Sequence, residues 1–260
     1  MKIVMIGTGN VATVLGRKIV QSGHHIIQVV GRDAERTQKL AASLNSPSAQ
    51  RFSEVKEEAD IYIIAVSDSA LADIELWFPV KKEGLVVHTA GSVSKDVLRN
   101  VGFHYGILYP LQSLRSDRAD IPEIPLLIDA NAPGTRQQIK QFAFTLSDKV
   151  QYADDELRMK LHAGAVIVNN FTNYLYTLTQ DFCTKEGIDF SLLQPLLKET
   201  VNRMEQFSPA LMQTGPALRN DGATISKHLS LLQAYPVLAK LYDQLSRSII
   251  HYYHEREQNG

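Results

Sequence analysis

Over roughly the first 150 residues, short apolar runs alternate with segments in which apolar residues recur every three or four positions. The short runs are rich in β-branched residues and end at glycine or polar positions, which is typical of buried strands. We expect strands at residues 2–6, 25–30, 61–66, 85–88, 106–109, 125–128 and near 150, and helices at 11–21, 34–44, 94–102 and 135–146. Strands that alternate with helices in this order predict parallel β-α-β units and a doubly wound sheet.

From Asp154 onward only the helical period remains. Apolar residues at alternating spacings of four and three predict one helix of about 26 residues between Leu157 and Phe182. Further on, Thr214-Gly215-Pro216 predicts a loop and a helix that starts at the proline, followed by a turn at Asp221-Gly222 and another helix. We therefore expect an α/β doubly wound domain at residues 1–152 and a smaller all-α domain at residues 153–260.

The charge and cysteine content narrow the possible partners. The chain has 27 Lys and Arg against 28 Asp and Glu, a net charge of −1, so it has no overall basic field for nucleic acid or an anionic membrane. Cys183 is the only cysteine, which rules out an intramolecular disulfide and a cysteine-rich zinc site. The first apolar run is broken by Gly7 and Gly9, and no run approaches the ~20 apolar residues of a membrane helix. We expect a cytoplasmic protein that binds neither nucleic acid nor membrane, and we expect no metal site.

A glycine-rich motif, Gly7-Thr8-Gly9-Asn10-Val11-Ala12, follows the first predicted strand and opens the first predicted helix. In a Rossmann dinucleotide site the first glycine permits a tight turn, the second leaves room for the pyrophosphate, and a small third residue keeps helix and strand close. Free N–H groups at the helix N-terminus then bind the phosphates. An ordinary glycine turn is the alternative, but the strand–turn–helix context favours a dinucleotide. The residues expected to bind it here are Gly7, Thr8, Gly9, Asn10 and Val11.

The end of the second predicted strand, Gly31-Arg32-Asp33, bears on the choice between NAD and NADP. An NAD enzyme usually has an acidic residue at this point, which binds the ribose 2′-hydroxyl. Glycine followed by arginine suits a 2′-phosphate instead, because a guanidinium makes strong charge-assisted bonds to phosphate. We interpret Asp33 as the N-cap of the next helix rather than as a ribose ligand. The cofactor predicted from Gly31 and Arg32 is NADP, and the same pair argues against a methyltransferase that uses S-adenosylmethionine.

Later strand ends are expected at the same crevice, because ligands of open α/β sheets bind beyond the carboxyl ends of the strands. The segments concerned are Val66-Ser67-Asp68 and His88-Thr89-Ala90-Gly91-Ser92, while Tyr109 to Ser113 can face the nicotinamide end. Cap or turn chemistry explains Asp68 and Ser92 equally well. The further cofactor residues predicted here are Val66, Ser67, His88, Ala90 and Gly91.

Polar residues lie opposite the apolar stripe of the long helix, with His162 and Asn169 among them and Asn170 at the edge of the group. The neighbouring segment 163–168 is small or apolar all round, which indicates burial. Buried polar groups need partners, so these residues either make hydrogen bonds in the core or face a substrate cleft. Of the two, we favour the cleft. For Arg219 and Asp221 an ion pair that fixes a loop and an anion-binding role are both open.

Several motifs together resemble a known superfamily. They are Gly7 to Val11, His88 to Ser92, Pro110-Leu111-Gln112-Ser113, His162-Ala163-Gly164-Ala165 with Asn170-Phe171, and the spaced set Thr214, Gly215, Pro216, Arg219, Asp221, Thr224, His228 and Leu229. Residues 1–150 resemble the NADP-binding domain of pyrroline-5-carboxylate reductase, deazaflavin-dependent NADP reductases and the 6-phosphogluconate and β-hydroxyacid dehydrogenases. The whole chain resembles a branch described as NADP oxidoreductases, in which a helical domain of unassigned function follows. The resemblance implies that the long helix carries His162 into the cleft and that the helical domain forms a homodimer.

The chain departs from this branch at two points and from the related hydroxyacid dehydrogenases at a third. Tyr109 stands where the branch usually has a histidine, Asn220 stands where it has a glycine, and Lys160 with Gly164 does not reproduce the Lys–Asn pair of the hydroxyacid dehydrogenases. We therefore do not transfer the mechanism of those dehydrogenases.

The function predicted is an NADPH-dependent oxidoreductase that transfers hydride to a small carbonyl or imine substrate. A histidine near its natural pKa suits the accompanying protonation, so His162 is the expected general acid. Asn170 is expected to orient the substrate, and Arg219 with Asp221 to shape an anion-accepting end. The alternative is a noncatalytic protein that binds NADP(H) as a structural or sensing ligand, which Tyr109 in place of histidine favours.

Overall fold

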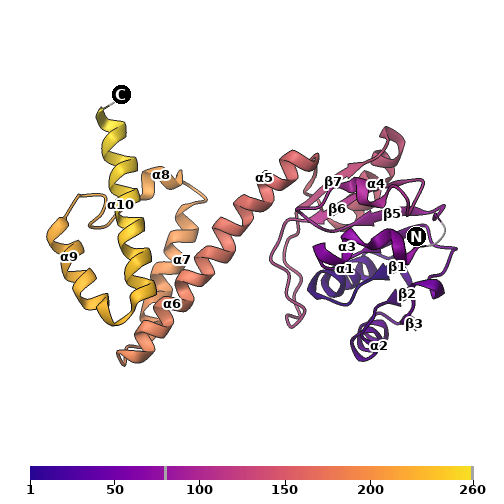
Figure 1. Cartoon of the computed structure of the whole chain (residues 1–260), viewed down its shortest axis with the longest axis horizontal. Helices are drawn as coiled ribbons and strands as arrows, with labels where there is room; N and C mark the ends of the chain where they lie inside the picture. Colours follow the sequence, from indigo (N-terminus) through magenta and orange to yellow (C-terminus); the bar gives the residue numbers. More distant parts are fainter. Residues whose placement is uncertain (79–80, 259–260) are drawn as a thin grey trace. The chain divides into compact units, whose positions relative to one another are not determined.

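The computed structural model describes residues 1–78 and 81–258 of the chain. It divides into two compact units, Met1–Asn169 and Asn170–Gly260 (Figure 1). The first unit therefore also contains the start of the long helix, beyond the boundary predicted near residue 152.

The first unit is built on an eight-stranded sheet in the order β3-β2-β1-β4-β5-β6-β7-β8. Its strands are β1 (Lys2–Ile6), β2 (His25–Val30), β3 (Ser48–Ala49), β4 (Ile61–Ile64), β5 (Leu85–His88), β6 (Tyr105–Pro110), β7 (Leu126–Ala130) and β8 (Val150–Tyr152). The strands from β3 to β6 are parallel, which confirms the doubly wound sheet. However, β7 is antiparallel to β6, and β8 is parallel to β7, so an all-parallel sheet is wrong for these two strands. Residues 111–125, which join β6 to β7, contain no helix to carry a parallel crossover.

Side chains of the central strands are buried on both faces of the sheet. In β1, Ile3 and Met5 pack in one cluster while Val4 and Ile6 pack in the other, as the two-residue period of a strand requires. The first cluster is covered by α1 (Asn10–Gln21), α2 (Ala34–Ser43) and α4 (Pro133–Leu146). The second is covered by α3 (Asp68–Ala72) and the 3₁₀ helices η2 (Ile74–Trp77) and η3 (Lys95–Leu98), while a further 3₁₀ turn, η1, spans Phe52–Glu54. The near-continuous apolar runs of the sequence therefore correspond to strands covered on both sides.

Helix caps fix the chain at the strand ends. Asp33 accepts a hydrogen bond from the Arg36 backbone N–H at 3.0 Å, which confirms it as the N-cap of α2. Ser94, at the start of the helix predicted over 94–102, caps the shorter 3₁₀ helix η3 that forms there. Capping, one of the explanations left open for Asp68, does not apply to it: the N-cap of α3 is Ser67, whose hydroxyl accepts from the Ala70 N–H.

The long helix predicted from Leu157 to Phe182 is confirmed as one continuous helical run. It consists of α5 (Asp155–Ala165), a π-helical segment η4 (Val166–Phe171) and α6 (Thr172–Lys185). A π-helical turn inside an α-helix is rare and is found mostly at functional sites. This turn directly follows the part of α5 that carries His162.

The second unit continues with further helices. They are η5 (Phe190–Leu193), α7 (Gln194–Arg203), α8 (Pro209–Met212), α9 (Gly222–Leu231), η6 (Leu232–Ala234) and α10 (Pro236–Gln258). The helix predicted to start at Pro216 is wrong. The Asp221 N–H donates to the Pro216 carbonyl and Asn220 has a φ of 51°, so the chain turns here and the helix begins only at Gly222. Within the described ranges, no helix is long and apolar enough to cross a membrane.

Candidate functional site

A cleft with a volume of about 640 Å³ lies at the carboxyl ends of β1, β2, β4 and β5 in the first unit. It contains all but one of the residues predicted to bind the cofactor, namely Gly7, Thr8, Gly9, Asn10, Val11, Gly31, Arg32, Val66, Ser67, Ala90 and Gly91. His162 from α5 and Tyr109 from β6 line the same cleft. The fold thus brings the dinucleotide loop and the predicted proton donor, which are more than 150 positions apart in sequence, into one cleft.

The two glycines of the motif have different structural tasks. Gly7 has a φ of 115°, and a Cβ there would lie 2.0 Å from the Ala65 carbonyl oxygen, so only glycine fits the turn between β1 and α1. Gly9 is the N-cap of α1, and a Cβ there would meet nothing within 4 Å. Open space above Gly9, together with the free N–H groups that begin α1, forms a binding position for an anion.

The Asn10 side chain is already engaged within the protein. Its Oδ1 accepts a hydrogen bond from the Ser116 N–H at 3.1 Å. Arg17, on the same helix, donates to the carbonyl oxygens of Ser116 and Arg118. The connection between β6 and β7 is thereby tied to the helix that follows the glycine-rich loop, so Asn10 contributes its backbone to the anion position and its side chain to this tie.

Arg32 lies where the ribose end of a dinucleotide is expected. Its guanidinium is 5.9 Å from the centre of the Trp77 ring, and both residues line the cleft. Arg36 also lines the cleft, and its Nε is 3.5 Å from the Asp33 carboxylate. Arg36 and Trp77 are not among the cofactor residues predicted from the sequence. The four-residue spacing of Arg32 and Arg36 at a helix start could have indicated the first of them, whereas nothing local to the sequence indicates Trp77.

His88 lies behind the cleft wall rather than in it, contrary to its predicted contact with the cofactor. The imidazole is fully buried, its Nδ1 accepts from the Ala90 N–H, and its Nε2 donates to the Ser94 carbonyl, each at 3.2 Å. Burial lowers the pKa of His88 to about 4, helped by the nearby charge of Arg158 and opposed by the bond to Ser94. A neutral His88 therefore shapes the segment that carries Ala90 and Gly91.

Asp68 and Ser92 connect two walls of the cleft. The Ser92 hydroxyl donates to the Asp68 carboxylate, which joins the loop after β5 to the start of α3. Of the two explanations that the sequence leaves open, neither capping nor ligand contact alone accounts for this bond.

Tyr109 and His162 form a hydrogen-bonded pair in the cleft. The phenolic oxygen is 2.9 Å from Nδ1 of His162, and the rings meet edge to face with centroids 5.9 Å apart. A Cβ at Gly91 would lie 2.8–2.9 Å from atoms of both side chains, so the absence of a side chain at Gly91 allows the pair to form. Burial raises the pKa of Tyr109, while the positive charge of Arg158 opposes the rise and Asp68 adds to it.

The other predicted catalytic residues belong to the second unit. Asn170 is exposed in η4, and Arg219 is exposed before α9. Asp221 caps α9 by accepting from the hydroxyl and the N–H of Thr224, and these bonds hold its pKa below the ordinary value, with a smaller contribution from Arg219. Asp221 therefore has a definite structural task, and the catalytic roles of all three residues stay predictions.

The residues of the described chain include no group of three His, Cys, Asp or Glu that could hold a metal ion. The groups that line the cleft include the start of α1, the Arg32 and Arg36 guanidinium groups and the Tyr109–His162 pair.

Comparison with family models divides the chain into two matches. Residues 2–90 match the model described as NADP oxidoreductase coenzyme F420-dependent. Residues 124–249 match a domain of unknown function (DUF2520). No curated protein matches the chain.

Solved structures resemble the chain over nearly its whole length. A Bacteroides fragilis protein, provisionally described as an NADP oxidoreductase, is 38% identical with a TM-score of 0.90, covering 96% of this chain and 98% of that one. A Thermotoga maritima protein is 18% identical with a TM-score of 0.78, covering 97% and 99%. An imine reductase from Myxococcus stipitatus in complex with NADP⁺ is 15% identical with a TM-score of 0.63, covering 100% and 95%, and like the T. maritima protein it shows a shared fold only. The identity to the B. fragilis protein shows that this chain belongs to the NADP oxidoreductase family that joins a Rossmann-like domain to DUF2520.

Proposed function

We propose that the chain is an NADPH-dependent reductase of a small carbonyl or imine substrate, in which His162 protonates the atom next to the carbon that is reduced. The observation that carries this proposal is the Tyr109–His162 pair, which lines the same cleft as the dinucleotide loop. The fold shared with an imine reductase and a pyrroline-5-carboxylate reductase from Streptococcus pyogenes is consistent with an imine or carbonyl substrate.

The chain's own groups account for cofactor binding as follows. The free N–H groups at the start of α1 bind the pyrophosphate, with the open space above Gly9 allowing its close approach. Arg32 and Arg36 bind the 2′-phosphate that distinguishes NADPH from NADH, because guanidinium groups match phosphate oxygens in charge and geometry. When bound, NADPH supplies the hydride.

His162 is suited to donate a proton by its hydrogen bond to Tyr109. In this proposal the Tyr109 hydroxyl donates to Nδ1, which leaves the imidazole proton on Nε2. That Nε2–H is the group that protonates the developing alkoxide or amine. From the sequence motifs we further propose that Asn170 orients the substrate and that Arg219 with Asp221 receives an anionic group.

We also propose that a second copy of the chain covers the helical unit. Between residues 170 and 254 only Cys183, Ala217, Leu232 and Ser246 are buried, which is a very small core for a helical unit. Many of its large apolar side chains are exposed, for example Leu192 (73%) and Leu211 (80%). Such extensive apolar exposure is typical of a surface that is covered in an oligomer.

The dimer proposal predicts a mass of twice 29.0 kDa by light scattering at micromolar concentration. The double variant Leu192→Lys, Leu211→Lys should shift the protein toward monomer, because charges would then lie in the apolar contact. Leu76→Lys is the matched control, since Leu76 is equally exposed (79%) but lies in the first unit. A monomeric wild-type protein would refute this part of the proposal.

Arg32→Ala should weaken NADPH binding by about 1.5–3 kcal/mol, roughly 10- to 150-fold, the range for a hydrogen bond to a charged group. NADH binding should change little, because NADH lacks the 2′-phosphate. Calorimetric titration of both cofactors against both proteins measures the difference. Equal losses for NADPH and NADH would contradict the role of Arg32 in cofactor choice.

The reductase itself is tested by NADPH oxidation against a panel of small carbonyl compounds and cyclic and acyclic imines. Turnover of a member of the panel with NADPH, and much slower turnover with NADH, is the expected result. Tight NADPH binding with no oxidation across the panel would instead favour a structural or sensing role, the alternative that Tyr109 raised in the sequence.

A further inference from the structure

We propose that Tyr109 and Arg158 complete a proton relay with His162: the phenol returns to His162 the proton that His162 gives to the substrate, and the buried guanidinium stabilises the phenolate that remains. The relay rests on the proposed role of His162 as the proton donor. In it Tyr109 is a second proton source and Arg158 is a positioning residue that does not touch the substrate.

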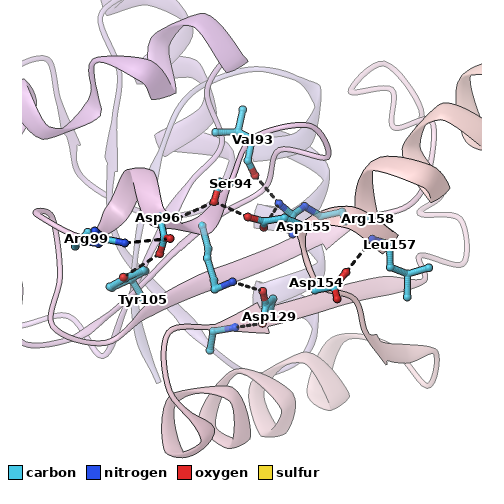
Figure 2. Close-up of polar contacts among 12 residues, drawn as sticks. Val93, Ser94, Asp96, Arg99, Tyr105, Asp129, Asp154, Asp155, Leu157 and Arg158 are labelled. Atoms are coloured by element: carbon cyan, nitrogen blue, oxygen red, sulfur yellow. Dashed lines mark hydrogen bonds and ion pairs between the residues drawn. The ribbon is translucent and has the colours of Figure 1, made fainter.

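Arg158 is one of the most buried side chains of the first unit, although it carries a full charge. Its side chain is 1% exposed. Nη2 donates to the Val93 carbonyl at 2.5 Å and to the Asp155 carboxylate at 2.8 Å (Figure 2). Nε and Nη1 are buried and have no hydrogen-bond partner among the residues that the structure describes. Burying a cation costs free energy of folding, and burying it without partners costs more. An arginine in this position therefore needs an explanation beyond packing.

The network around Arg158 joins α5 to the segment that forms one wall of the cleft. Asp155 accepts a 2.5 Å hydrogen bond from the Ser94 hydroxyl (Figure 2). Lys95 pairs at 2.7 Å with the buried carboxylate of Asp129 on β7. Although partial burial raises the pKa of Asp155, the bonds from Ser94 and Arg158 hold it below its ordinary value, so the carboxylate stays charged. Residues 93–95 are thus held from both sides.

Two members of this network are close in sequence to residues of the Tyr109–His162 site. Arg158 and His162 are four residues apart on α5, a spacing that makes them neighbours on one face of the helix. Val93, which Arg158 holds, is two residues from Gly91, and the space left by Gly91 is where Tyr109 and His162 meet. Arg158 is thus connected to both sides of the pair, through α5 to His162 and through Val93 to Gly91.

Charges from two elements act on the phenol of Tyr109. Asp68 at the start of α3 disfavours the phenolate and Arg158 on α5 favours it, while His162 on α5 accepts its hydrogen bond. Burial alone would hold the proton on the phenol. Arg158 opposes that effect, which is what a second proton source in an apolar wall requires.

The proton transfers balance without a further reactant. The Nε2–H bond of His162 breaks as an O–H or N–H bond forms on the substrate. The O–H bond of Tyr109 breaks as an N–H bond forms at Nδ1. His162 then holds its proton on Nδ1 and Tyr109 is a phenolate. Before the next turnover Nε2 takes a proton from water and the Nδ1 proton returns to the phenolate, which restores the starting state and leaves hydroxide in the solvent.

The electrostatic part of the relay is measured on the ligand-free protein, so it can be read even if no reductase activity is found. Tyrosine is replaced throughout by 3,5-difluorotyrosine, and the ¹⁹F resonance of residue 109 is identified as the one missing from the Tyr109→Phe variant. Arg158→Gln should raise the midpoint of its titration by about one pH unit, since a buried positive charge that favours the phenolate is lost. Asp155→Asn should lower the midpoint, because Arg158 then acts without its neutralising partner.

Opposite shifts are the result that a purely structural role of the network does not produce. Arg99→Gln is the matched control, because Arg99 is an exposed cation of the same region that pairs with Asp96 instead. An unchanged midpoint in folded Arg158→Gln, or a shift of the same sign in Asp155→Asn, would overturn the proposal. If circular dichroism shows that Arg158→Gln does not fold, Asp155→Asn decides alone: a lower midpoint supports the proposal and an unchanged one overturns it.

The catalytic part of the relay is measured with a double-mutant cycle once a substrate is in hand. Arg158→Gln should lower kcat in the wild-type background and have little further effect when residue 109 is phenylalanine, since no phenolate then forms. An equal loss in both backgrounds would mean that Arg158 acts only through the fold, and the relay would be wrong.

Discussion

Replacement of His162 by alanine is expected to lower kcat for NADPH-dependent reduction by about 10²–10⁴-fold, the usual contribution of a general acid. The reason is the geometry of the pair: the Tyr109 hydroxyl lies 2.9 Å from Nδ1, so Nε2 is the imidazole nitrogen left for the substrate. NADPH affinity should change little, because the phosphates are bound by the start of α1 and by Arg32. Steady-state kinetics with the best substrate of the panel, together with calorimetric NADPH titration, measures the two quantities separately.

Lys160→Ala is the matched control for this variant. Lys160 is on the same helix, and its exposed ion pair with Glu156 contributes little to stability. We expect its kcat to equal that of the wild-type protein. A His162→Ala protein that is folded, binds NADPH and retains full turnover would remove His162 from the mechanism, and would leave Tyr109 as the proton donor to test next.

The sheet was largely predictable because its strands are covered on both faces. A strand with both faces buried is a near-continuous apolar run, as in residues 61–64 and 85–88, and such runs stand out against polar caps such as Asp33 and Ser94. The reversal of β7 was not predictable in this way. Strand direction depends on whether the connection carries a helix, and residues 111–125 give no local signal of what replaces one.

The candidate site was predictable where it is local in sequence and was missed where it depends on distant pairs. The glycine-rich loop and Arg32 lie within one β-α-β unit, so spacing alone indicates them. The bond between Tyr109 and His162 joins residues 53 positions apart, and the clamp of Arg158 on Val93 joins residues 65 positions apart. Sequence periodicity does not indicate such distant pairs. In the sequence Tyr109 looks like the loss of a histidine, whereas in the structure its phenol is hydrogen-bonded to His162, the predicted acid.

His88 illustrates the opposite error. Its position at the end of a strand predicts contact with a ligand, but a side chain at a strand end can equally well point into the core of a sheet that is covered on both faces. The side chain is buried, and both of its ring nitrogens form hydrogen bonds with the backbone of the following loop. A polar residue at a strand end therefore indicates either a ligand or a support for the loop that binds it, and only the direction of the side chain distinguishes the two.

The two glycines of the dinucleotide loop should respond to the same substitution in opposite ways. Gly7→Ala is expected to destabilise the first unit by about 2–5 kcal/mol, because alanine would have to adopt a φ of 115° with its Cβ against the Ala65 carbonyl. Gly9→Ala is expected to change the free energy of unfolding by less than about 1 kcal/mol, because its φ of −82° is accessible to alanine and the space around the new methyl group is empty. Urea unfolding measures both changes.

In contrast to its small effect on stability, Gly9→Ala should have a large effect on NADPH affinity. The methyl group of Gly9→Ala would occupy the space through which the pyrophosphate approaches the start of α1, and overpacking of this kind costs about 1–3 kcal/mol, roughly 5- to 150-fold in NADPH affinity. The variant should therefore be as stable as the wild-type protein and a much weaker binder by calorimetry. Undiminished NADPH affinity in Gly9→Ala would show that the phosphates do not sit on α1. The cleft would then have lost the group that fixes where the nicotinamide, and so the hydride, meets His162.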